Sequence, residues 1–123
     1  MQTNIQEVEI NGIKYVQKDS VQSQALSKSG YAIVRCYTAG VFMGYVAESD
    51  MAKGTAKLKD ARRMWYWAGA ASLSQLAMEG TSSPKDCKFP CAVTEIALGG
   101  VIEIIPVTEK AYKSISEVKV WQQ

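Results

Sequence analysis

The stretch DARRMWYWAGAASLSQLAMEG, residues 60–80, is the segment around which the sequence predicts that the fold is organised. Asp60 is a good helix N-cap, because its short side chain can accept a hydrogen bond from a free backbone N–H of the first turn. Gly80 tolerates the left-handed conformation in which helices commonly end. The residues between them predict one long central helix, about 30 Å in length.

The apolar residues of this predicted helix cover more than one of its faces, unlike those of an ordinary surface helix. They are Met64, Trp65, Ala68, Ala71, Leu73, Leu76, Ala77 and Met78. The rest of so small a chain can cover one side of the helix, so we expect a second subunit to cover another. The small residues 68–72 would let another backbone, or a ligand, approach closely. The sequence therefore predicts a homo-oligomer, either a dimer or a higher even-numbered assembly.

Two arginines and three large aromatic rings lie together at the start of this segment. They are Arg62, Arg63, Trp65, Tyr66 and Trp67. Guanidinium groups bind phosphate oxygens in a bidentate manner, and a planar ring can stack on a base, so the cluster predicts a nucleotide site. The alternative is that the tryptophans belong to the core and the arginines pair with acids on a neighbouring element.

Arg35 and Phe89 complete the set of candidate binding residues. Arg35 lies between aromatic neighbours on a predicted strand, and is either the cross-strand partner of an acid or a third anion-binding group. Phe89 lies in the Pro- and Ser-rich loop TSSPKDCKFP, residues 81–90, in which Lys85 and Lys88 are further candidates. Loops on a rigid scaffold often carry binding residues, although a solvated connection is the alternative. The predicted ligand-binding residues are thus Arg62, Arg63, Trp65, Trp67, Arg35 and Phe89.

The composition limits the chemistry that the chain can perform. The 123 residues include no histidine, which removes the commonest general base, the commonest metal ligand and every Ser-His or Cys-His nucleophile. The three cysteines, Cys36, Cys87 and Cys91, indicate reduced thiols rather than a disulfide framework. Cys87 and Cys91 are spaced C-x-x-x-C, but with Cys36 as the one other thiol a structural zinc would need a carboxylate or a shared site. We predict no catalytic residues, no metal and no cofactor. An enzyme that uses carboxylates such as Glu95 or Glu103 is an alternative without a paired acidic motif to support it.

The charge and the hydropathy of the chain bound its partners and its location. The formal net charge of +2 is small for a protein that binds a phosphate polymer, which argues against nucleic acid as a partner. No segment is long and apolar enough to span a bilayer, and the N-terminal residues lack the features of a signal peptide. We therefore expect a cytosolic protein that does not associate with membranes.

The predicted elements form a single domain of the α+β class, with a mostly antiparallel sheet. An N-terminal β-hairpin around Asn11-Gly12 occupies residues 1–18, a polar linker occupies 19–30, and the main body occupies 31–123. Thr108 predicts the N-cap of a shorter C-terminal helix with Ala111, Ile115 and Val118 on one face. The strands of the main body are predicted at residues 31–38, 41–48, 55–59, 91–98 and 101–108. The first two are expected to form a hairpin around Ala39-Gly40, and Pro106 is expected to end the pairing of the last.

Several of these segments together resemble a family of small phage proteins. The motifs are EINGIKYVQKDSV, YAIVRCYTAGVFMGYV, DARRMWYWAGAASLSQLA, KFPCAVTEI and VIEIIPVTEKA. On them the chain resembles the Thoeris anti-defence sponges of the first-described type, from about Glu9 onward. The motif positions that match the family are Arg35, Arg62, Arg63, Trp65 and Trp67.

The resemblance implies a binding protein that is not an enzyme. Members of that family sequester cyclic ADP-ribose isomers, which a bacterial TIR protein makes on infection, so that the Thoeris effector is never activated. They form dimers and higher oligomers with ligand near subunit interfaces, and some take up cyclic oligonucleotide signals at a separate site. The implied location is the cytoplasm of the infected bacterial host. A small nucleic-acid-binding phage accessory protein is the alternative function.

Overall fold

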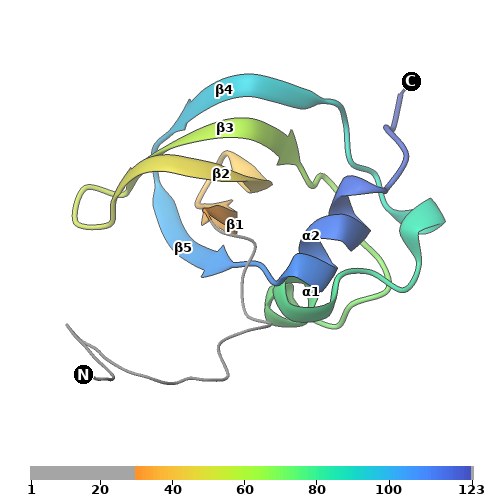
Figure 1. The fold of residues 1–123 in the computed structure, drawn as a ribbon. Helices are drawn as coiled ribbons and strands as arrows, with labels where there is room; N and C mark the ends of the chain where they lie inside the picture. Colours follow the sequence, from red (N-terminus) through yellow and green to blue (C-terminus); the bar gives the residue numbers. More distant parts are fainter. Residues whose placement is uncertain (1–29, 123) are drawn as a thin grey trace, which may run out of the picture.

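A computed structural model describes residues 30–122 of the chain, which fold into one five-stranded antiparallel sheet and short helices (Figure 1). The order of the strands across the sheet is β4-β3-β2-β1-β5. The strands are β1 (Tyr31–Cys36), β2 (Gly40–Asp50), β3 (Thr55–Arg63), β4 (Ala92–Leu98) and β5 (Val101–Pro106). The helices are α1 (Leu73–Glu79), the 3₁₀ turn η2 (Pro84–Asp86) and α2 (Glu109–Ser116).

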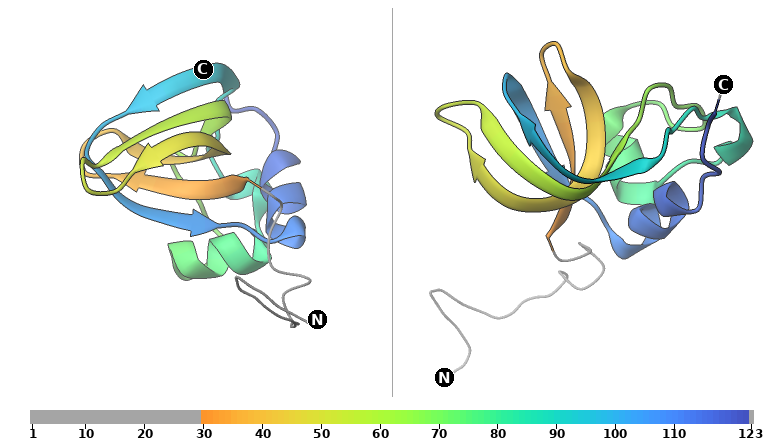
Figure 2. Two further views of the ribbon diagram at one scale, coloured as in Figure 1. Left: turned by 60° about the vertical axis from the view of Figure 1, so that its left-hand side comes forward. Right: turned by 90° about the horizontal axis from the view of Figure 1, so that it is seen from above.

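The sheet is strongly curled, so that it resembles a half-open barrel (Figure 2). Only Gly99 and Gly100 separate β4 from β5, although these two strands lie at opposite edges of the sheet. The backbone N–H of Val101 donates to the carbonyl of Gly54 at 2.9 Å, which ties the β2–β3 turn to the start of β5. The concave side encloses a core of Val34, Cys36, Phe42, Ala56, Leu58, Ala61, Leu98 and Val101.

The helices cover a second face of the sheet, on the opposite side of the molecule from the β2–β3 turn (Figure 1). Ile33 and Met43 on this face pack against α1, α2 and the segment that joins β3 to β4. The buried residues contributed by the helices and that segment are Met64, Leu76, Ala77, Cys87, Phe89, Val107, Ala111, Ile115 and Val118. Strand β1 therefore lies between two cores, and both Ile33 and Val34 are fully buried.

The prediction of a long central helix over residues 60–80 is wrong, and the predicted fold class is wrong with it. Residues 60–63 continue strand β3, and α1 contains only the seven residues Leu73–Glu79. Asp60 and Ala61 stand opposite Gly44 in a bulge of the β2–β3 ladder, and Asp60 has a φ of 51°. Pairing with β2 and β4 therefore decides the conformation of residues that have good helix-forming neighbours.

The N-cap of α1 is Ser72, and not Asp60 as predicted, because the Ser72 side chain accepts from the backbone N–H of Gln75 at 3.1 Å. Upstream, Gly69 has a φ of 81°, a left-handed conformation that no helix continues through. The predicted stop at Gly80 is correct, because its N–H donates to the carbonyl of Leu76 at 2.9 Å. The helix that was expected to need a second subunit is thus short, and it packs on the chain's own core.

Other local predictions are confirmed. Strands β1 and β2 form the expected antiparallel hairpin, and β5 ends at Pro106. Thr108 caps α2 by accepting from the N–H of Ala111 at 3.0 Å, and Ala111 and Ile115 are buried. The predicted N-terminal hairpin and all but the last residue of the predicted linker lie outside the described residues. No helix within residues 30–122 has the length and apolar character needed to cross a membrane.

Candidate functional site

A groove of about 540 Å³ lies between the β1–β2 turn and the chain that leaves β3. Residues 38–41, from the β1–β2 turn and the start of β2, form one wall, and Arg63, Met64, Trp65 and Trp67 form the other. Strand β3 ends at Arg63, and the N–H of Met64 then donates to the carbonyl of Val41 at 2.8 Å. This bond fixes the spacing of the two walls. The groove brings together three of the predicted site residues, Arg63, Trp65 and Trp67.

Arg63 is an exposed cation in this groove. Its guanidinium carbon lies 4.6 Å from the centroid of the buried Phe42 ring, which holds the side chain by a cation–π contact. The ion pairs within residues 30–122 join Arg35 to Glu103 and Lys57 to Glu95, so none of them involves Arg63. The guanidinium is therefore held in place while its N–H donors are available to an anion.

The two tryptophans of the groove differ in their surroundings. Trp67 is half-buried and packs against the core beneath the helices. Trp65 is 61% exposed and stacks on Trp121, with ring centroids 5.2 Å apart and planes inclined by 6°. Opposite them, Gly40 has a φ of 101° and open space where a Cβ would lie, so the backbone is accessible there. The groove thus combines one cation, two large rings and an open stretch of backbone.

Arg62 is adjacent to Arg63 in sequence but lies on the opposite face of β3, and it is 7% exposed. Its guanidinium donates to four backbone carbonyls, those of Pro90 and Ile115 at 3.0 Å, Phe89 at 3.0 Å and Val118 at 2.6 Å. Burial lowers the pKa of this guanidinium, and the thiols of Cys87 and Cys91 counteract part of that effect. Four of its five donors therefore join β3, the loop at residue 89 and the end of α2. We assign Arg62 a structural role.

The remaining predicted residues also lie outside the groove. Arg35 donates from Nε to Glu103 Oε1 at 2.8 Å, across the β1–β5 pair, which is the cross-strand alternative that the sequence left open. Phe89 is fully buried, and its carbonyl accepts from Arg62. Lys88, one of the loop candidates, and Trp121, which the sequence prediction missed, approach Trp65 from distant parts of the chain. The only local signal at Trp121 is its residue type.

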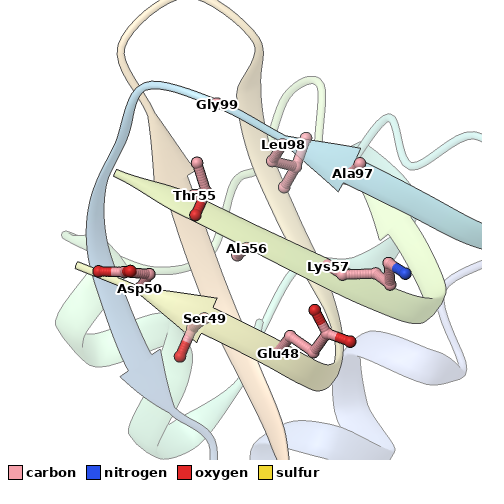
Figure 3. A pocket seen from close by; sticks show the side chains of 9 residues that line it. All are labelled: Glu48, Ser49, Asp50, Thr55, Ala56, Lys57, Ala97, Leu98 and Gly99. Atoms are coloured by element: carbon pink, nitrogen blue, oxygen red, sulfur yellow. The ribbon is translucent and has the colours of Figure 1, made fainter. Parts of the chain in front are cut away.

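A second hollow, of about 470 Å³, lies among the end of β2, the start of β3 and the end of β4, and contains none of the predicted site residues (Figure 3). Glu48 and Asp50 from β2, Lys57 from β3 and Gly99 line it, with two hydroxyl-bearing side chains between them. Within residues 30–122 no three acidic or cysteine side chains are grouped so that they could hold a metal ion. The mixed charge of this hollow suits an anionic nucleotide less well than the groove beside Arg63.

Residues 29–115 match a family described as a domain of unknown function, DUF6948. The chain belongs to this family. The match includes every lining residue of the groove, whereas Trp121 lies beyond it. No curated protein and no solved structure shows significant similarity to the chain.

Proposed function

We propose that this DUF6948 protein binds and sequesters cyclic nucleotide signals, of the cyclic ADP-ribose type, without cleaving them. The observation that carries the proposal is the groove in which Arg63, without an ion pair among the described residues, lies beside Trp65 and Trp67. The resemblance to the Thoeris anti-defence sponges supports the same ligand class.

The groove offers the contacts that such a ligand requires. A guanidinium can bind the oxygens of a pyrophosphate by paired charge-assisted hydrogen bonds. A base can stack on Trp67, whose orientation is fixed by the core, or on the exposed Trp65. At Gly40 no side chain separates the ligand from the backbone. A volume of about 540 Å³ is within the range of small-molecule sites.

The chemistry of the groove supports binding rather than hydrolysis. Its described lining residues include no carboxylate and no thiol, and the chain has no histidine. Arg63 is the charged group among them, and a guanidinium does not act as a general base at neutral pH. A bound nucleotide would therefore meet cationic and aromatic surfaces without a group placed to activate water.

The biological part of the proposal rests on the resemblance. By lowering the free concentration of the signal, the protein would prevent activation of a Thoeris-type effector in the cytoplasm of the infected bacterial host. The proposed state is a homo-oligomer. With α1 only seven residues long, this part also rests on the resemblance rather than on an uncovered helix face.

The test is to mix the purified protein with a panel of cyclic ADP-ribose isomers, pass the mixture through a size filter, heat the retained protein and chromatograph both fractions. We expect at least one isomer to leave the filtrate and to return chemically intact after heating. Recovery of a linear product would identify an enzyme, and ligand that stays in the filtrate would overturn the proposal.

A pair of variants tests the assignment of the groove. Arg63→Gln removes the proposed phosphate contact, and we expect it to weaken binding about tenfold or more, as for loss of a charged hydrogen bond. Lys53→Gln removes the same charge from the exposed β2–β3 turn, far from the groove, and should leave the affinity unchanged. Equal effects of the two substitutions would show that Arg63 does not contact the ligand.

A further inference from the structure

The stacked pair Trp65–Trp121 is an unusual surface feature, because stacking between two indoles leaves their outer ring faces unused. Trp65 is 61% exposed, and Trp121 is half-buried. Lys88 Nζ lies 5.4 Å from the centroid of Trp65 and 5.6 Å from that of Trp121. Since these distances are nearly equal, the ammonium lies beside the pair rather than over an outer face. A cation therefore accompanies the pair without blocking a third ring from stacking on it.

The surface continues in both directions from this pair. On the Trp121 side lies a hollow of about 210 Å³, lined by Pro84, Lys85, Cys87, Lys119, Val120 and Trp121. On the Trp65 side lies the groove that contains Arg63. We call the row formed by Arg63, Trp65, Lys88, Trp121, Lys85 and Lys119 the aromatic–basic strip.

The cations of the strip have no acidic partner among the described residues. The ion pairs within residues 30–122 join other side chains, so none of them involves a cation of the strip. Asp86 of η2 lies between Lys85 and Lys88 in sequence, but it forms no ion pair with either of them. Glu48 and Asp50 lie at the opposite end of the sheet, beside the hollow of Figure 3. Even with Asp86 and Glu117 counted against them, the four cations of the strip leave a local excess of positive charge, which the small net charge of the whole chain conceals.

We propose that the aromatic–basic strip binds single-stranded nucleic acid. Proteins that bind single strands without sequence preference combine a row of cations along the backbone with aromatic platforms for the bases. The strip supplies both, from three separate segments of the chain: the end of β3, the loop around η2 and the C-terminal residues. A duplex would not fit this chemistry, because its bases are already stacked on one another.

The experiment measures the anisotropy of a fluorescein-labelled oligothymidylate of roughly ten nucleotides, within the site sizes of single-strand-binding folds. The full-length protein is titrated at several salt concentrations. We expect binding that weakens with salt and that exceeds the binding of a duplex of equal length. Trp121→Ala should weaken binding about tenfold, as for loss of one stacked base.

Charge reversal provides a second set of variants that leaves packing intact. Lys119→Glu and Lys85→Glu are at exposed positions, and each should lower the magnitude of the slope of log K against log salt by about 0.7. Lys53→Glu makes the same change of net charge at the far end of the sheet and should leave the slope unchanged. Correct folding of each variant is established by its circular dichroism spectrum.

Three outcomes would overturn the proposal: no binding of the oligothymidylate at low salt, equal binding of the duplex, or equal effects of Lys53→Glu and Lys119→Glu. Arg63 and Trp65 belong to both the strip and the groove, whereas Lys119, Lys85 and Trp121 do not line the groove, so substitutions at these three positions test the strip separately from the proposed sequestration of cyclic nucleotides. A protein that retains cyclic ADP-ribose but not the oligothymidylate would refute the strip alone, and the reverse result would refute the groove alone.

Discussion

The guanidinium of Arg62 donates to the backbone carbonyl of Val118 at 2.6 Å, and so joins strand β3 to the residues that follow helix α2. The same group donates to the carbonyls of Ile115, Phe89 and Pro90. None of these partners is an acid, so the charge is stabilised by four carbonyl dipoles. Part of this network satisfies a carbonyl at the end of α2, where cations are favourable.

We predict that Arg62→Met lowers the free energy of unfolding by about 3 kcal/mol, because it leaves the carbonyls of Pro90 and Val118 without a donor among the described residues. The carbonyls of Phe89 and Ile115 keep the backbone N–H groups of Trp121 and Val118 as donors. Arg62→Lys should restore only part of the loss, since one ammonium cannot reach partners on both the loop and the helix. Urea unfolding followed by tryptophan fluorescence measures both variants.

The neighbouring arginine is the matched control. Arg63→Met should lower the free energy of unfolding by less than about 1 kcal/mol, the value of an exposed cation–π contact. The same substitution should abolish the proposed phosphate contact. If Arg62→Met instead kept full stability and lost nucleotide binding, Arg62 would be a ligand residue, as the sequence suggested.

The bulge at Asp60 predicts a measurable backbone cost. Asp60 has a φ of 51°, where a side chain is disfavoured and glycine is not. Asp60→Ala and Asp60→Gly both remove the carboxylate that accepts from the Tyr31 hydroxyl at 2.9 Å. The difference between their free energies of unfolding therefore isolates the cost of the backbone conformation at residue 60. We expect the glycine variant to be the more stable by about 1 kcal/mol. Equal urea midpoints would show that the left-handed conformation at residue 60 is not kept in solution.

Tyr31 predicts how stability depends on pH. Burial raises the pKa of this phenol above its ordinary value of 10.0, and the hydrogen bond to Asp60 and the charge of that carboxylate raise it further. Above pH 10 the unfolded chain therefore loses this proton while the folded chain keeps it, so the free energy of unfolding falls as pH rises.

Tyr31→Phe should remove this component of the alkaline loss, measured as the difference between the urea midpoints at pH 8 and above pH 10. Tyr37→Phe is the control, because Tyr37 is 81% exposed. Burial also raises the pKa of the Cys36 thiol, so part of the alkaline loss will persist in both variants. An unchanged pH dependence in Tyr31→Phe would contradict the assignment.

Local sequence signals predicted those elements whose geometry depends on neighbours along the chain. The cap at Thr108, the stop at Gly80 and the end of β5 at Pro106 follow from the preferences of single residues. The long helix failed because residues 60–63 complete a ladder with β2 and β4, and that pairing depends on Gly44, which is distant in sequence. Tertiary pairing outweighed helix propensity there.

The site was predictable in part for the same reason. Arg63, Trp65 and Trp67 share one short segment, and alternation along it places Arg62 on the other face. Treating the segment as helical concealed that separation, since a helix would have put both arginines at one end. Lys88 and Trp121 come to Trp65 through an isolated bridge of Tyr66 with Lys88 and another of Phe89 with Val120, which no local pattern indicates.

Trp65 lines the groove and also belongs to the aromatic–basic strip, so the three tryptophans should separate the two proposed activities. We predict that Trp67→Phe weakens only the cyclic nucleotide, that Trp121→Ala weakens only the oligothymidylate, and that Trp65→Ala weakens both. Each loss of affinity should be about tenfold where the substitution removes the ring on which a base stacks. The loss should be smaller for Trp67→Phe, which keeps an aromatic ring against the core. Isothermal titration calorimetry with the retained isomer and anisotropy with the oligothymidylate measure the two affinities. If Trp67→Phe and Trp121→Ala weakened both ligands alike, the groove and the strip would be one site, and the two ligands would compete for it.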